Sequence, residues 1–334
     1  MSKIFRCVSA VLLFITTCAA TAQTAQDIAA LKVKAESGDA KAQYDLGMKY
    51  AQGQGVARND SEAANWYRKA AEQGNADSEF YLGLFCDQGI GIPQDHAAAT
   101  QWYRKAAEQN NARAQISLGA KYLTGSGVPQ DYAQAVLWFR KAAEQGDPVA
   151  QNNLGVAYDD GQGVPQDFAQ AVVWYRKAAE QGEEEAEERL GELYRNGQGV
   201  PQDYTQAVYW TRKAAEQGNA HAQGNVGYFY QQGVGVPQDY AQAAFWDRKA
   251  AEQGNALTQF NLGLLYANGQ GVPQDYAEAY FWFDLAAAGK LDAPAAKFAS
   301  QDRDSVASML APADLSAAQE RARKWFEDHP AKAQ

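Results

Sequence analysis

Residues 111–146 read NARAQISLGAKYLTGSGVPQDYAQAVLWFRKAAEQG, and this stretch predicts two short helices joined by a loop. Leu118 and Tyr122 recur at helical spacing, which indicates a first helix that runs to about residue 123. Gly125 is a typical helix stop because glycine tolerates the left-handed conformation. Pro129 prevents the first helix from continuing.

A second helix is predicted to begin at Asp131. The carboxylate of this residue can accept hydrogen bonds from the exposed backbone N–H groups of the first turn, and Gln134 follows at the spacing of a capping box. Trp138 lies on the apolar face of this helix, and Gly146 ends it. The stretch therefore predicts one helical hairpin.

The same pattern returns every 36 residues. Tryptophan marks the period at Trp66, Trp102, Trp138, Trp174, Trp210, Trp246 and Trp282, and glycine at Gly47, Gly83, Gly119, Gly155, Gly191, Gly227 and Gly263. A fixed period of this length indicates one supersecondary unit copied in tandem. The chain thus carries seven copies over residues 39–290. Since glycine inside a helix costs about 1 kcal/mol, we expect the recurring glycine to permit close approach of the paired helix beneath an aromatic ring.

The order L-G-x-x-Y, then G-x-G-V-P-Q-D-Y-x-x-A-x-x-W-Y-R-K-A-A-E-Q-G, resembles the Sel-like (Sel-one-like) repeat family, a relative of tetratricopeptide repeats. The few departures are Ala57 for proline, Cys86 for tyrosine and Val226 for leucine. The resemblance implies an all-α fold, a right-handed α-solenoid of seven helix-turn-helix repeats that scaffolds protein complexes. It implies no catalytic residue set, and the N-terminus makes this chain similar to an exported bacterial member.

Residues 1–22 have the features of a secretory signal peptide. Lys3 and Arg6 precede a short apolar stretch, and Ala20-Thr21-Ala22 provides a small-x-small cleavage site that leaves Gln23 first. We therefore expect a periplasmic or secreted protein. Lipid attachment at Cys18 is the alternative. The apolar stretch is too short to span a bilayer, and no later segment reaches about 20 apolar residues.

The two ends of the array should close its core. Residues 23–38 are predicted to form an N-terminal capping helix. Residues 291–334 should provide C-terminal capping helices and a tail, since Val306, Met309 and Leu310 mark one amphipathic stretch, and Leu315, Ala322, Trp325 and Phe326 mark another.

Composition and motifs argue against nucleic-acid binding and against catalysis. The net charge is −10, whereas nucleic-acid binding requires basic patches. The three histidines lie at unrelated points of the array, cleavage would leave Cys86 as the single cysteine, and no metal-protease motif or phosphate loop is present. We therefore expect no cofactor, no bound metal and no enzymatic activity. A hydrolase remains the alternative that this reasoning disfavours.

Positions that differ between the seven copies while facing solvent should specify partners. Such positions recur on the first helix of each repeat, on one stripe away from the core residues. First helices line the concave face of tetratricopeptide-like arrays, so we predict a groove there. Its predicted partner-binding residues are Tyr44, Phe80, Arg113, Ile116, Asn152, Asp159, Glu185, Glu188, Glu192, Arg195, His221, Tyr228 and Phe260.

The acidic middle of this groove has two interpretations. Five of the six residues at 183–188 are glutamates. Such a run is usually a solvated first helical turn, where negative charge suits the helix N-terminus. The other interpretation is a patch for a basic partner.

The groove as a whole is compatible with two functions. The protein could be a scaffold that holds a protein or peptide in the groove, or a factor for envelope polysaccharide whose groove aromatics stack on sugars.

Overall fold

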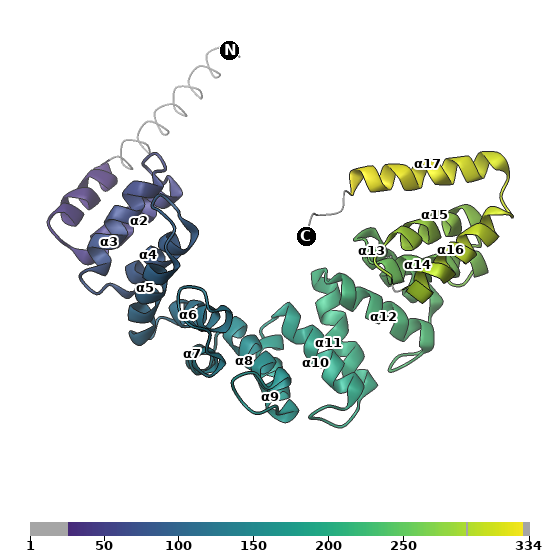
Figure 1. Cartoon of the computed structure of the whole chain (residues 1–334), viewed down its shortest axis with the longest axis horizontal. Coiled ribbons are helices and arrows are strands. Elements are labelled where there is room, and N and C mark those ends of the chain that lie inside the picture. Colours follow the sequence, from purple (N-terminus) through teal and green to yellow (C-terminus); the bar gives the residue numbers. More distant parts are fainter. Residues whose placement is uncertain (1–25, 292, 330–334) are drawn as a thin grey trace, which may run out of the picture. The chain divides into compact units, whose positions relative to one another are not determined.

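The computed structural model describes residues 26–291 and 293–329, and within them every regular element is a helix (Figure 1). Each repeat forms a first and a second helix, as predicted. The first helices are α2 (Ala40–Gln52), α4 (Ala76–Gln88), α6 (Ala112–Thr124), α8 (Pro148–Asp160), α10 (Glu184–Asn196), α12 (Ala220–Gln232) and α14 (Ala256–Asn268). The second helices are α3 (Asp60–Ala71), α5 (His96–Glu108), α7 (Tyr132–Glu144), α9 (Phe168–Ala179), α11 (Tyr204–Gln217), α13 (Tyr240–Glu252) and α15 (Tyr276–Ala288).

The chain divides into two compact units, one up to residue 166 and one from residue 167. In the first unit each helix from α2 to α8 packs against the next along the chain. The second unit repeats this arrangement from α9 to α16, and α17 packs against α15. Neighbours in sequence are thus neighbours in space within each unit, as expected of a repeat array.

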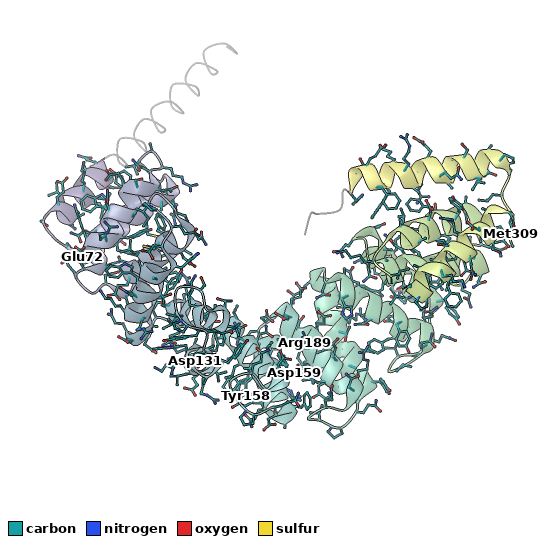
Figure 2. All side chains as sticks on the ribbon, viewed as in Figure 1. Glu72, Asp131, Tyr158, Asp159, Arg189 and Met309 are labelled. Carbon is teal, nitrogen blue, oxygen red and sulfur yellow. The ribbon has the colours of Figure 1, made fainter. Side chains whose placement is uncertain are left out.

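Local capping sets the helix boundaries. The carboxylate of Asp131, labelled in Figure 2, accepts a hydrogen bond from the backbone N–H of Gln134 at 3.0 Å and so caps α7. Gly125 ends α6 with a left-handed φ of 73°. Asn110 has a φ of 67° where five other repeats have glycine, and asparagine is the residue other than glycine that a left-handed position tolerates best. The predicted boundary signals are therefore confirmed.

An aromatic ring explains the glycine inside the first helix. A Cβ atom on Gly119 would lie 2.6 Å from Cε1 of Phe139 in α7, and one on Gly47 would lie 2.8 Å from the ring of Tyr67 in α3. Only a residue without a side chain permits this approach. The ring that covers the glycine belongs to the residue after the repeat tryptophan, while Trp246 shares a core cluster with Ala214 and Ala215 of the preceding repeat.

In three of the repeats a buried glutamine amide links the first helix to the preceding helix and to the end of its own second helix. Gln115 in α6 donates from Nε2 to the carbonyl oxygen of Ala107 at 3.1 Å, and its Oε1 accepts from Gln145 of α7 at 2.7 Å. Gln43 and Gln223 make the same pair of bonds in their own repeats. This connector satisfies polar groups that would otherwise be costly to bury.

Helices also stand at both ends of the repeats. Residues 26–36 are helical, and Ala35 of this segment is fully buried against α2. Beyond α15 lie α16 (Ala293–Ala307) and α17 (Pro312–Asp328). Val306 and Ala322 are buried, and the guanidinium of Arg321 lies 3.8 Å from the ring centroid of Phe281. Met309, between the two helices in Figure 2, is exposed.

The predicted signal peptide at residues 1–22 lies outside the residues that the structure describes. Among the residues it does describe, no helix combines the length and the apolar character needed to cross a bilayer.

Candidate functional surface

The variable stripe occupies four positions on each first helix, and we call it the first-helix surface. One of these positions is exposed in all seven repeats, although its residue type changes at every copy. Its members are Lys41, Asp77, Arg113, Val149, Glu185, His221 and Leu257. A position that is always exposed and never repeated is not required by the fold. It is therefore free to contribute to recognition.

A second position of the stripe is half-buried in six of the seven repeats, and Asn152 is the exception. Asn152 is only 3% exposed. We predicted a solvent-facing residue there, and that prediction was wrong. Tyr44, Phe80 and Phe260 at the same position are half-buried, and so is Gly224, so side-chain length does not account for the burial of Asn152.

In the unit up to residue 166, the aromatic residues of the stripe belong to a packed cluster. Tyr44 lies with its ring centroid 6.0 Å from that of Tyr81, and Phe80 lies 5.3 Å from Tyr81 and 5.9 Å from Tyr103. Burial raises the pKa of Tyr44 to about 12. These rings therefore pack in the core and are also partly accessible at the surface.

Three further predicted residues of this unit lie on two helices. Arg113 is exposed and Ile116 half-buried on α6, and Asp159, labelled in Figure 2, is half-buried near the end of α8. The structure does not gather them into one compact site.

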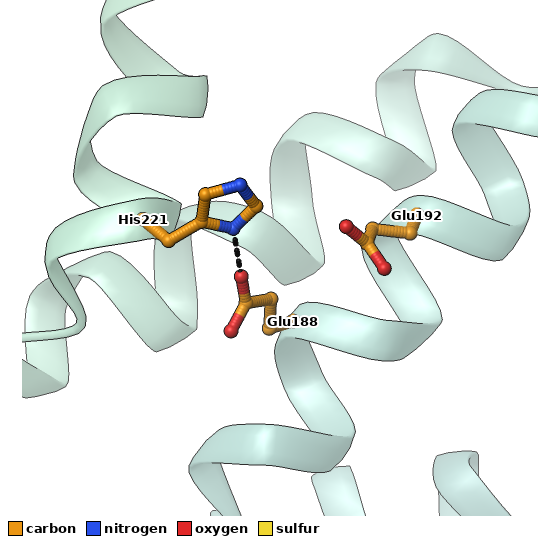
Figure 3. Close-up of side chains that lie close together, drawn as sticks. All are labelled: Glu188, Glu192 and His221. Atoms are coloured by element: carbon orange, nitrogen blue, oxygen red, sulfur yellow. Dashed lines mark hydrogen bonds and ion pairs between the residues drawn. The ribbon is translucent and has the colours of Figure 1, made fainter. Parts of the chain in front are cut away.

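In the unit from residue 167, three predicted residues do meet. Glu188 and Glu192 lie one turn apart on α10, and His221 lies in the first turn of α12 (Figure 3). Nδ1 of His221 is hydrogen-bonded to Oε1 of Glu188, and the amide of Asn219 donates to Oε2 of the same carboxylate at 2.8 Å. Arg189 lies 3.4 Å from the carboxylate of Glu192.

Hydrogen bonding between the two repeats shifts the titration of this pair. The bond from His221 lowers the pKa of Glu188, and the same bond raises the pKa of His221. The ion pair is therefore favoured over the neutral pair. Both side chains are partly accessible, with exposed fractions of 17% for Glu188 and 62% for His221.

A hollow lies beside the pair, between α12 and α14. Its walls include Arg195, Asn225, Tyr228, Leu257 and Asn261. Tyr228 is 48% exposed and Leu257 is 56% exposed. The hollow thus combines apolar surface with amide groups and one guanidinium. Phe260, the remaining predicted residue, packs its ring 5.6 Å from that of Phe283 and is half-buried.

The glutamate run is used more by the fold than we predicted. Glu183 is the N-cap of α10, where its carboxylate accepts from the backbone N–H of Ala186 at 2.7 Å. Glu187 is buried and accepts from Gln217 at 2.9 Å, in the position of the amide connector. Glu183 and Glu187 therefore contribute to the fold, a role that neither interpretation of the glutamate run included. Glu185 remains exposed.

The single cysteine among the described residues shows no sign of reactivity. Cys86 is buried, and that burial raises the pKa of its thiol, which keeps the thiol in its unreactive protonated form.

Sequence reasoning missed how close His221 comes to Glu188, and it missed Asn219, Asn225 and Asn261. A signal was available in the period. First helices of consecutive repeats lie side by side, so residues separated by 31 to 34 positions meet, as Asn111 and Asp77 do at 3.0 Å. Residues slightly less than one period apart are therefore the pairs to compare.

The profile of the Sel1 repeat family matches residues 40–75, 76–111, 112–147, 148–183, 184–219, 220–255 and 256–290. The chain belongs to this family, as its repeated motif predicted. Sel1 repeat proteins are generally scaffolds for protein interactions and are typically non-catalytic. No curated protein matched the chain.

One solved structure supports the assignment, and two others are reported for their similarity alone. A Sel1 repeat protein from Oxalobacter formigenes is 39% identical with a TM-score of 0.67, over 83% of this chain and 80% of that one. The protein c5321, a protective antigen present in uropathogenic Escherichia coli strains, is 31% identical with a TM-score of 0.45, over 93% and 83% of the two chains. Cysteine rich protein B from Helicobacter pylori is 28% identical with a TM-score of 0.33, over 40% and 95%.

Proposed function

We propose that this chain is an exported, non-enzymatic scaffold that binds a protein or peptide partner on its first-helix surface. One observation carries the proposal: a position on every first helix is exposed in all seven repeats and changes identity in each. Residues that build the hairpins are repeated, whereas these are not. Variation confined to exposed positions is expected of a recognition surface.

Export rests on the signal-like composition of residues 1–22. We propose a periplasmic or secreted location on that basis, with lipid attachment at Cys18 as the alternative. In either location the scaffold would meet its partner outside the cytoplasm.

The unit from residue 167 offers the most distinctive surface for a partner. Glu185 contributes exposed negative charge on α10, and Tyr228 and Leu257 contribute exposed apolar area on α12 and α14. Exposed apolar surface of this kind commonly marks an interface. A segment that pairs basic side chains with an apolar anchor would complement it.

Site-specific photo-crosslinking tests the location of binding. A photoreactive amino acid is placed at residue 228 or 257, and in matched controls at residue 209 or 245 on the second helices. Tyr209 and Phe245 are 50% and 49% exposed, so access alone does not separate the two sets. We expect one discrete crosslinked protein from the first-helix positions. Equal crosslinking from both sets, or crosslinking from the controls alone, would refute the assignment.

Charge reversal tests the chemistry of the partner. Glu185→Lys should weaken capture of the crosslinked protein and reduce its salt dependence, because electrostatic attraction speeds association at low salt. Glu144→Lys, an exposed residue at the end of α7, provides the control. A partner without a basic segment would bind both variants equally.

A cell-envelope polysaccharide is the second candidate ligand. The observation in its favour is the exposed ring of Tyr228 with the amides of Asn225 and Asn261 in the same hollow. Aromatic stacking combined with amide hydrogen bonds suits a sugar. Titration with purified envelope glycans should then show binding that Tyr228→Ala abolishes, and Tyr209→Ala should leave that binding unchanged.

A further inference from the structure

We propose that Glu188, Glu192 and His221 form a binding site for a divalent transition-metal ion, with Zn²⁺ as the best match. The three side chains come from two consecutive first helices, and one ligand atom from each lies within 4.8 Å of the other two (Figure 3). This goes beyond partner binding and differs from our expectation from sequence spacing, which predicted no bound metal.

The geometry lies close to that of a coordinated zinc ion. Zinc bonds to carboxylate oxygen and imidazole nitrogen are about 2.0–2.2 Å long, which places tetrahedral ligand atoms about 3.3–3.6 Å apart. The ligand atoms of Glu188 and His221 are hydrogen-bonded, and they would separate to this spacing as the metal ion replaces the shared proton. Glu192 would need to close by at most about 1.5 Å, a movement that rotation of its own flexible side chain provides.

The residue types select the class of metal. An imidazole nitrogen with two carboxylates suits zinc and its first-row neighbours, whereas calcium and magnesium prefer all-oxygen sites. Two carboxylates and a neutral imidazole also balance the charge of a divalent ion. Three protein ligands would leave a fourth position for water or for a group from a bound partner.

A neighbouring residue already holds one ligand in place. Asn219 caps α12 through Oδ1, which accepts from Ala222 at 2.8 Å, and its Nδ2 donates to Oε2 of Glu188 at 2.8 Å. The carboxylate is thereby fixed with Oε1 toward His221. Partners of this kind orient the ligands of natural metal sites.

The other repeats show that the fold does not require these residues. The position of Glu188 is Tyr, Phe, Ile, Asn, Gly or Phe in the other six copies, and the position of Glu192 is Met, Leu, Ala, Val, Tyr or Leu. His221 stands where the others have Lys, Asp, Arg, Val, Glu or Leu. Three ligand-type side chains therefore converge at one junction between repeats without a packing need.

The chain supplies its own control in a second histidine–carboxylate pair. Nδ1 of His96 lies 2.6 Å from Oδ1 of Asp87, but the ammonium group of Lys121 is bonded to that same oxygen. The place of a metal ion is thus filled by the buried ammonium of Lys121, whereas Arg189 beside Glu192 is 47% exposed and can turn away into solvent. If a histidine beside a carboxylate were sufficient for zinc binding, both pairs would bind zinc. We expect binding only at Glu188, Glu192 and His221.

Zinc titration of the tag-free full chain by calorimetry, after treatment with a chelator, tests the proposal. We expect one Zn²⁺ per chain, and no binding of Mg²⁺ or Ca²⁺ at the same concentration. His221→Ala and Glu192→Gln should each weaken binding by at least about tenfold, since loss of a mere supporting residue already costs about 10–100-fold. His96→Ala should bind as the wild type does.

Three further measurements distinguish loss of the site from loss of structure and identify the ligands. Circular dichroism should show unchanged helix content in the variants. Saturating Zn²⁺ should raise the unfolding temperature of the wild type and of His96→Ala, but not that of His221→Ala. Absorption of bound Co²⁺ should report a single nitrogen ligand with oxygen ligands. Absence of zinc binding in the wild type, or equal binding by His221→Ala, would overturn the proposal.

Discussion

Asp247 on α13 should make the protein less stable as the pH rises. The residue is fully buried, and neither of its carboxylate oxygens has a hydrogen-bond partner among the described residues. It stands at the position where five of the other six second helices carry tyrosine or phenylalanine and α11 carries Thr211, and its carboxylate faces the repeat glycine Gly227. Burial raises its pKa from 3.8 to about 8. The folded state therefore keeps Asp247 protonated at neutral pH.

The pKa values of Asp247 in the unfolded and the folded chain determine the sign and size of its effect on the free energy of unfolding. Below pH 3.8 both the folded and the unfolded chain carry the proton, so Asp247 has no electrostatic cost. Between pH 3.8 and about 8 only the unfolded chain ionises, and the free energy of unfolding falls by about 1.4 kcal/mol per pH unit. At pH 7 the cost reaches about 4 kcal/mol, an upper value because water and side chains relax around a buried charge. Above about pH 8 the cost is constant.

Asp247→Asn removes the ionisable group while retaining its shape. We expect this variant to unfold at a higher denaturant concentration than the wild type at pH 8. Its free energy of unfolding should be greater by about 2–4 kcal/mol, and this difference should shrink toward pH 5. Urea unfolding followed by circular dichroism across this range measures the effect. Glu252→Gln, an exposed change on the same helix, is the control and should show little difference from the wild type. Parallel pH profiles for Asp247→Asn and the wild type would refute the reasoning.

Three other predictions concern the core and the N-terminus. Trp138→Ala should cost about 3–5 kcal/mol, as for other large-to-small core changes, with amide protection lost first in α6 and α7 by hydrogen exchange. Gly119→Ala should cost about 1–3 kcal/mol because its Cβ would meet Phe139 at 2.6 Å. Adding Phe139→Leu to Gly119→Ala should recover part of the lost stability. Adding Phe139→Leu to Gly146→Ala should recover none, because the strain there comes from a φ of 94°. Intact-mass measurement of exported protein should show a chain that begins at Gln23, and a full-length chain would contradict export.

Sequence alone predicted the hairpins because their determinants are local. Asp131 caps a helix and Gly125 ends one through groups within a few residues of each other. Because the motif is repeated along the chain, the same hairpin forms in each copy. The sequence also predicted that the glycine of the first helix permits close approach of an aromatic ring. That ring belongs to the residue after the tryptophan.

The candidate surface was less predictable because it depends on how neighbouring helices are offset. Position on the stripe did not reveal that Asn152 is buried. Nor did charge reveal that Glu187 replaces a buried glutamine and accepts the same hydrogen bond. The pairing of Glu188 with His221 required the distance between adjacent first helices, which a single repeat does not contain.

The amide connector has a consequence for how such a gene can change over generations. Each junction that carries Gln43, Gln115 or Gln223 is joined by the same bonds, so recombination that excises one copy would bring together ends that already fit. The interior would accept a shorter array. The pair of Glu188 and His221, by contrast, exists at one junction only and would be lost with either copy. Gain or loss of whole copies is thus a route by which this protein could exchange its binding properties while its fold is inherited unchanged.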